Sequence, residues 1–102
     1  FRVPRGMLPQ AVKEYESVPI TGYSVTVPHK EAAAALAAER DVAVTITGAA
    51  NTLVRRADGS FFASNTDYAA AVESLKDHLR ERAEESGAPT VQINQLSVLI
   101  LG

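Results

Sequence analysis

The sequence contains no cysteine, no long apolar run and no marked excess of charge of either sign. Without cysteine the chain forms no disulfide and no thiolate metal site, which fits a reducing compartment without proving one. No apolar run approaches the roughly 18 residues that a membrane-spanning helix needs, and no secretory signal is visible. A net charge of −2 gives no electrostatic reason to expect nucleic acid or an anionic membrane as a partner. We therefore expect a cytoplasmic protein that binds neither.

The length and composition are those of one modest globular domain. A chain of 102 residues lies at the lower end of typical domain sizes, about 100–150 residues, and 46% hydrophobic with 22% charged residues is ordinary. The sequence opens on Phe1 rather than methionine and ends on an apolar run, so we expect both ends to be cut.

The stretch from Gly22 to Lys30 (GYSVTVPHK) joins a β-prone run to a proline, an imidazole and an amine. Alternation along a strand over 20–27 predicts two faces: Tyr23, Val25 and Val27 on one, Ser24 and Thr26 on the other. Pro28 ends this strand and suits the first turn of a helix. Lys30 would then project from a strand-to-helix corner, which is where ligands bind in open α/β sheets. The alternative is a plain strand ended by proline, with a solvated lysine behind it.

Local patterns predict the other elements of the first two thirds of the chain. Leu8, Val12 and Tyr15 follow helical spacing and predict a helix over about 9–17. The alanine-rich run 31–39 predicts a packing helix, whereas 41–47 is β-branched and is left undecided between strand and helix. Asp-Gly within 57–59 predicts a hairpin between 52–56 and 60–64, with Asn51 at its entrance and 65–67 at its exit.

The last third is predicted to be a long helix, a linker and a strand. Apolar residues recur on one helical stripe from position 68, namely Tyr68, Val72, Leu75 and Leu79. Thr66 or Asp67 is a natural N-cap for this helix, and 86–89 should stop it. Residues 88–95 read as a linker, and 96–102 as a buried strand.

Three ordered motifs resemble the shikimate dehydrogenase family. They are Ser-Val-Thr-Val-Pro-His-Lys at 24–30, Gly-Ala-Ala-Asn-Thr at 48–52 and Asn-Thr-Asp at 65–67. The resemblance implies an α/β fold, a layered mixed sheet with flanking helices. It also implies that 1–87 is an N-terminally truncated substrate-binding domain, and that 96–102 begins a missing NAD(P)-binding Rossmann domain of the same chain.

The resemblance assigns roles to five residues. Lys30 and Asp67 would form the catalytic pair, and the substrate-binding set would be Ser24, Thr26, Lys30, Asn51 and Asp67. A lysine ammonium can both donate a proton to a forming alkoxide and stabilise its charge. Asp67 could instead be only a helix cap, and Asn51 only a turn residue. His29 is interpreted as structural, and no metal site is expected.

The activity implied is NADP-dependent reduction of 3-dehydroshikimate to shikimate in aromatic amino-acid biosynthesis. The nucleotide site would lie beyond Gly102, and the family's upstream Ser-x-Ser is absent, so the chain alone should be inactive. Some relatives are fused to a 3-dehydroquinate dehydratase, and such a fusion stays open here. The alternatives are an NAD-dependent quinate/shikimate dehydrogenase and a non-catalytic quinate/shikimate-sensing module of the same fold. We further expect Thr26, Lys30, Asn51 and Asp67 to converge on one pocket.

Overall fold

The computed structural model describes residues 1–87 and residue 89, and it divides the chain into two compact units, 1–67 and 68–102. The predicted linker over 88–95 and strand over 96–102 lie outside the described residues, apart from residue 89. Each unit is described by itself.

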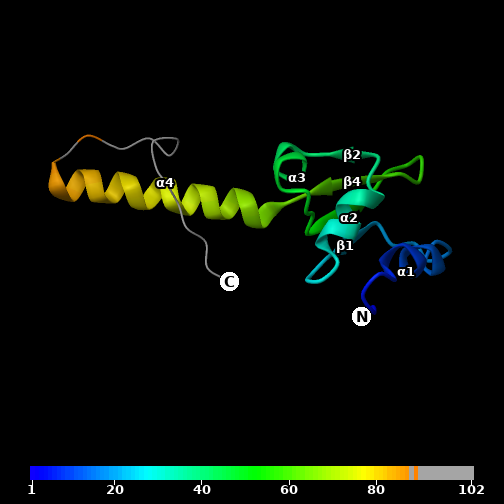
Figure 1. Cartoon of the computed structure of the whole chain (residues 1–102). Coiled ribbons are helices and arrows are strands. Elements are labelled where there is room, and N and C mark those ends of the chain that lie inside the picture. Colours follow the sequence, from blue (N-terminus) through cyan, green and yellow to red (C-terminus); the bar gives the residue numbers. More distant parts are fainter. Residues whose placement is uncertain (88, 90–102) are drawn as a thin grey trace. The chain divides into compact units, whose positions relative to one another are not determined.

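The first unit is built on a four-stranded mixed sheet in the order β1-β3-β4-β2 (Figure 1). The strands are β1 (Gly22–Ser24), β2 (Glu39–Arg40), β3 (Thr52–Arg55) and β4 (Phe61–Ser64). β1 and β4 pair antiparallel with β3, while β2 pairs parallel with β4. The mixed sheet with its helices confirms the predicted α/β class.

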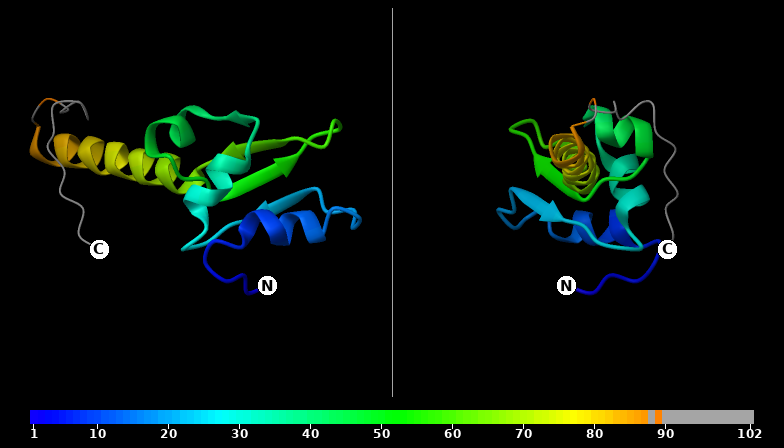
Figure 2. Two further views of the ribbon diagram at one scale, coloured as in Figure 1. Left: turned by 45° about the vertical axis from the view of Figure 1, so that its right-hand side comes forward. Right: turned by 90° about the vertical axis from the view of Figure 1, so that its left-hand side faces the viewer.

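The central hairpin forms where the Asp-Gly signal predicted it (Figure 2). Gly59 has φ +85°, a left-handed conformation that glycine adopts without the steric cost of a Cβ atom. The turn is closed by a hydrogen bond of 2.8 Å from the Arg56 N–H to the Ser60 carbonyl. Asp58 Oδ1 accepts the Ser60 N–H at 2.9 Å. The register brings Thr52 opposite Ser64, so the residues before β3 and after β4 meet at one end of the ribbon.

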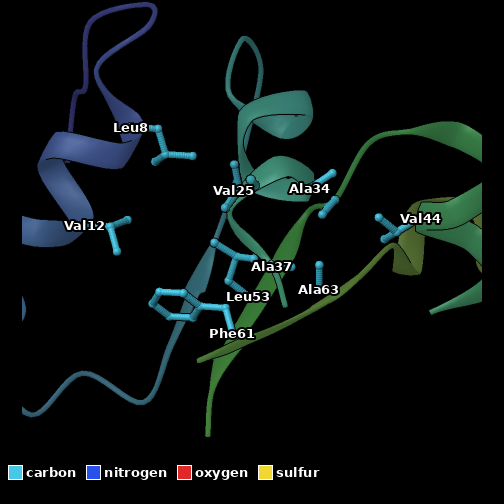
Figure 3. Packing of buried hydrophobic residues seen from close by; sticks show 11 residues of the cluster. Leu8, Val12, Val25, Ala34, Ala37, Val44, Leu53, Phe61 and Ala63 are labelled. Carbon is cyan, nitrogen blue, oxygen red and sulfur yellow. The ribbon is translucent and has the colours of Figure 1, made fainter. Parts of the chain in front are cut away.

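Two helices and the sheet enclose the core of this unit. Helix α1 (Leu8–Glu14) buries Leu8 and Val12, and helix α2 (Lys30–Leu36) buries Ala33 and Ala34. The small alanine side chains let α2 approach β4 closely, and α1 packs on α2. Figure 3 shows Leu8 and Val12 on one side of Leu53, which is fully buried, and Ala34 on the other. The predicted helix over 9–17 is therefore present but shorter.

The undecided segment 41–47 is a helix, α3 (Val42–Thr47). Asp41 caps its N-terminus, since the carboxylate accepts the Val44 N–H at 2.7 Å. Gly48 ends it with φ +69°, the left-handed cap in which glycine is preferred. The two end signals outweigh the modest helix propensity of the β-branched residues between them.

Two expectations at the N-terminal side were wrong in detail. The strand predicted over 20–27 covers only Gly22–Ser24, because residues 26–29 form a turn in which the His29 N–H donates to the Thr26 carbonyl at 2.9 Å. Val27, expected on the same strand face as Val25, is 77% exposed, whereas Val25 is buried. The short β-prone run at residues 1–3, which could have been the remainder of an edge strand, forms no strand.

The long helix is α4 (Thr66–Ser86), and it begins two residues before Tyr68, the first residue of the apolar stripe. Thr66 and Asp67, both proposed as caps, lie inside its first turn. Gly87 follows it with φ +68°, in agreement with the predicted stop. Val72, Leu75 and Leu79 are half-buried, and no residue of α4 is fully buried.

Candidate active site

Lys30 and Asp67, which lie 37 residues apart in sequence, form an ion pair. The Lys30 Nζ donates to Asp67 Oδ2 at 2.8 Å, and the two side chains are 30% and 63% exposed. An ion pair this accessible to water is screened by solvent and contributes little to stability. The contact therefore contributes little to the stability of the fold, and both side chains remain accessible to a bound molecule.

Lys30 is placed by the corner between β1 and α2. The Val27–Pro28 peptide bond in this corner is cis, and α2 begins at Lys30. The Lys30 carbonyl also accepts the Ala50 N–H at 2.8 Å. The second motif is thereby tied directly to the backbone of the first.

Asn51 connects that turn to the start of α4. Its Nδ2 donates to Thr66 Oγ1 at 2.9 Å, and its Oδ1 accepts the Thr66 N–H at 3.2 Å. The Asn51 side chain also hydrogen-bonds the Asp67 carboxylate. All three motifs that carried the family resemblance thus meet through Lys30, Asn51 and Asp67.

The charge of Asp67 is stabilised from two sides. The Lys30 ammonium, first as a hydrogen-bond donor and then as a nearby positive charge, holds the pKa of Asp67 below its ordinary value of 3.8. Desolvation opposes this effect, and the hydrogen bond from Asn51 adds the smallest of the contributions that lower the pKa. At neutral pH Asp67 is therefore a carboxylate, which accepts the hydrogen bond that Lys30 donates.

Ser24 and Thr26 line a cavity of about 320 Å³ beside α1. Its wall also contains Tyr23 and His29, whereas Lys30, Asn51 and Asp67 do not line it. The end of β1 nevertheless lies beside Asn51, because the Val25 N–H donates to the Asn51 carbonyl at 2.7 Å and Ser24 is opposite Thr52. Of the four residues expected in one pocket, the structure brings Lys30, Asn51 and Asp67 into direct contact. Thr26 lies in the turn before Lys30 and has no such contact with them.

His29 is held in the structure by the N-terminal segment. Its side chain is 9% exposed, and its Nε2 lies 2.6 Å from the Val3 carbonyl oxygen. Since a carbonyl only accepts, Nε2 must carry the proton in this contact. This geometry agrees with the structural interpretation of His29.

Two residues that support the site escaped the sequence reasoning. Asp41 caps α3 with one carboxylate oxygen and accepts the Asn65 N–H with the other at 3.3 Å. Asn65 in turn donates from Nδ2 to the Ala49 carbonyl at 2.9 Å, joining the second and third motifs. An aspartate directly before a helix is a recognisable cap signal, but it was usable only once 41–47 was known to be helical.

Neither a metal centre nor a membrane span is found in the described part of the chain. Its histidine, aspartate and glutamate side chains form no group of three or more that could hold a metal ion. None of its helices combines the length and the apolar character needed to cross a bilayer.

Comparison with known proteins identifies the family of this chain. Residues 1–53 match the family model of the shikimate dehydrogenase substrate binding domain. The chain is 36% identical over 80 residues to the chloroplastic bifunctional 3-dehydroquinate dehydratase/shikimate dehydrogenase of Arabidopsis thaliana, an alignment covering 78% of this chain and 13% of that protein. It is 33% identical over 84 residues to the shikimate dehydrogenase (NADP(+)) of Paracoccus denitrificans, with 82% of this chain and 30% of that protein covered.

The structural comparison agrees. The crystal structure of shikimate dehydrogenase from Aquifex aeolicus superposes with a TM-score of 0.65 and 28% identity, covering 76% of this chain and 29% of that one. The chain thus spans less than a third of the length of each of these three proteins. It belongs to the shikimate dehydrogenase family, and its first half matches that family's substrate-binding domain.

Proposed function

We propose that this chain is the substrate-binding part of an NADP-dependent shikimate dehydrogenase, which reduces 3-dehydroshikimate to shikimate in aromatic amino-acid biosynthesis. The observation that carries the proposal is the 2.8 Å contact between Lys30 and Asp67, because it joins two of the three sequence motifs in a proton-transfer geometry. Relatives named as NADP(+)-dependent shikimate dehydrogenases support the choice of substrate and nucleotide. A cytoplasmic location is part of the same proposal.

In this proposal Lys30 is the general acid. Reduction of a ketone places negative charge on the carbonyl oxygen, and the Lys30 ammonium can stabilise that charge and protonate the forming alkoxide. Asp67 orients the ammonium and balances its charge, since its Oδ2 accepts the hydrogen bond from Lys30 Nζ at 2.8 Å. Ser24, Thr26 and Asn51 would bind the hydroxyl and carboxylate groups of the substrate.

The nucleotide would be held elsewhere in the enzyme, where it supplies the hydride when bound. Among the described residues, the glycines at 6, 22, 48, 59 and 87 are widely separated, and none forms a glycine-rich strand-to-helix turn. Such a turn is what exposes backbone N–H groups to a pyrophosphate. The described part of the chain therefore does not fit NADP.

We accordingly predict that residues 1–102 do not bind NADP with micromolar affinity. Isothermal titration calorimetry of NADP into the purified chain would measure this directly. A second titration with shikimate serves as the control for a folded protein. Micromolar NADP binding would contradict the assignment of the nucleotide to another part of the enzyme.

The activity is tested in the enzyme that carries this chain, by following NADPH oxidation after addition of 3-dehydroshikimate. We expect turnover with 3-dehydroshikimate and NADPH, and slower turnover with dehydroquinate or with NADH. Absence of turnover with every pair would sink the proposal and favour a ligand-sensing role. Because the Arabidopsis thaliana relative is bifunctional, fusion to a dehydratase stays within the proposal, and a 3-dehydroquinate dehydratase assay on the same preparation tests it.

A further inference from the structure

We propose that Thr66 is a positioning residue for the Lys30–Asp67 pair and that it acts through the carboxamide of Asn51. The inference rests on the proposed function, since it assigns a residue to that reaction. Thr66 is the middle residue of the Asn-Thr-Asp motif, and the sequence predicted only a helix cap for it.

Two hydrogen bonds join the same two residues, and together they dictate the orientation of the Asn51 amide. The Thr66 N–H is purely a donor, so the amide oxygen must face it, at 3.2 Å. The amide nitrogen then faces Thr66 Oγ1, at 2.9 Å. Thr52 Oγ1 also donates to the Asn51 oxygen at 3.0 Å. A rotated amide would set its NH₂ group against the Thr66 N–H, two donors facing each other, and would lose that contact.

The orientation matters because Asn51 is also a neighbour of the catalytic carboxylate. Its side chain hydrogen-bonds Asp67, whose other partner is Lys30 on α2, the charged group that faces this carboxylate. A carboxylate accepts hydrogen bonds only, so it requires the nitrogen end of the amide on its side. Removing the Thr66 hydroxyl would free that end and weaken the hold on Asp67.

The backbone of Asn51 gives this arrangement a rigid base. The Asn51 N–H donates to the Ser64 carbonyl at 3.1 Å, and its own carbonyl accepts the Val25 N–H at 2.7 Å. Asn51 is therefore fixed between β1 and β4, and its side chain is the adjustable part. Thr66 is exposed, so its hydroxyl is not needed to fill the core. Both features fit a residue that sets geometry rather than stability.

The experiment compares Thr66→Val with Thr66→Ser in the enzyme that carries this chain. Valine keeps the branched shape and the backbone N–H but removes the hydroxyl, whereas serine keeps the hydroxyl. For Thr66→Val we expect kcat to fall about five- to tenfold, the value of one ordinary hydrogen bond, with a smaller change in KM. The acidic limb of the kcat/KM profile should move to higher pH, because the Asn51 amide, whose hydrogen bond lowers the pKa of Asp67, is held less firmly. Thr66→Ser should recover most of the rate.

A carbon-13 NMR titration of the Asp67 carboxyl group, recorded without substrate, keeps this inference separate from the proposed reaction. The pKa of Asp67 should rise in Thr66→Val and stay near that of the wild type in Thr66→Ser. If the wild type does not reduce 3-dehydroshikimate, the proposed function fails, and the titration still decides the positioning role.

Several results would overturn the inference. They are wild-type kinetics and titration in Thr66→Val, equal losses in the valine and serine variants, or a rise in KM with kcat unchanged. A thermal melt of each variant checks folding, and Thr66→Ala replaces the valine variant if that one does not fold. Failure of both to fold would make the hydroxyl a folding requirement and would equally contradict a positioning role.

Discussion

Replacing Lys30 by alanine should lower kcat of the enzyme that carries this chain by about 10²–10⁴-fold. Among the described residues, the Lys30 ammonium is the only group that forms an ion pair with Asp67, and it can donate a proton. Its removal takes away the proton donor and the positive charge that faces the alkoxide, a loss of roughly 3–5 kcal/mol in the transition state. The remaining proposed substrate contacts are untouched, so KM should change much less than kcat.

Steady-state kinetics with 3-dehydroshikimate and NADPH measures this, with Lys13→Ala as the matched control. Lys13 is an exposed lysine in the last turn of α1, outside the cluster formed by Lys30, Asn51 and Asp67. The control should retain nearly full activity, and both variants should melt close to the wild type, because the ion pair is too exposed to stabilise the fold by much. A Lys30→Ala enzyme with near-wild-type kcat would end the assignment of Lys30 as the general acid.

Short-range signals were sufficient for much of the fold. The Asp-Gly turn predicted the hairpin because Gly59 can take a positive φ that other residues rarely adopt, and the pairing of β3 with β4 follows from that turn. The hairpin alone also indicated that Asn51 and residues 65–67 meet at one end of the ribbon. Asn51 and Thr66 do meet there, through two hydrogen bonds.

Other features depend on contacts that a local pattern does not contain. The apolar alternation over 20–27 continues past Ser24, but the backbone turns at 26–29 and leaves Val27 exposed. Residues 42–47 are mostly β-branched, and only the cap at Asp41 and the left-handed Gly48 make them helical. The bridge from Asp41 to Asn65 spans 24 residues, and no spacing rule predicts it.

The same distinction applies to the site. The motif resemblance named Lys30 and Asp67, and the structure places the two side chains in contact. It did not indicate that Asn51 reaches the same carboxylate, or that Thr66 holds Asn51 in place. Those relations arise from the packing of three turns against one another. Contacts between side chains on separate turns are the part of a site that a linear pattern conveys least.

Replacing Asp67 by asparagine should lower kcat at least about tenfold and leave the fold intact. Helix α4 begins at Thr66, so Asp67 lies within the first turn, and its carboxylate accepts from the Lys30 side chain. Its effect on the helix is therefore limited to the weak, solvent-screened interaction of a negative charge with the helix N-terminus. Asparagine keeps the size and one oxygen acceptor but loses the charge that orients and balances the ammonium. A purely structural Asp67 would leave the rate nearly unchanged.

The pH dependence of stability provides a second measurement on the same variant. The folded-state pKa of Asp67 lies below the ordinary 3.8 because of Lys30 and Asn51. The stabilisation that comes with its charge is therefore fully present above pH 3.8 and is lost as the pH falls through the lowered value. Thermal melts of the wild type and Asp67→Asn should differ slightly at neutral pH and converge in strong acid. A kcat equal to that of the wild type, together with identical melts at every pH, would show that Asp67 neither partners Lys30 in the reaction nor carries a charge that the fold uses.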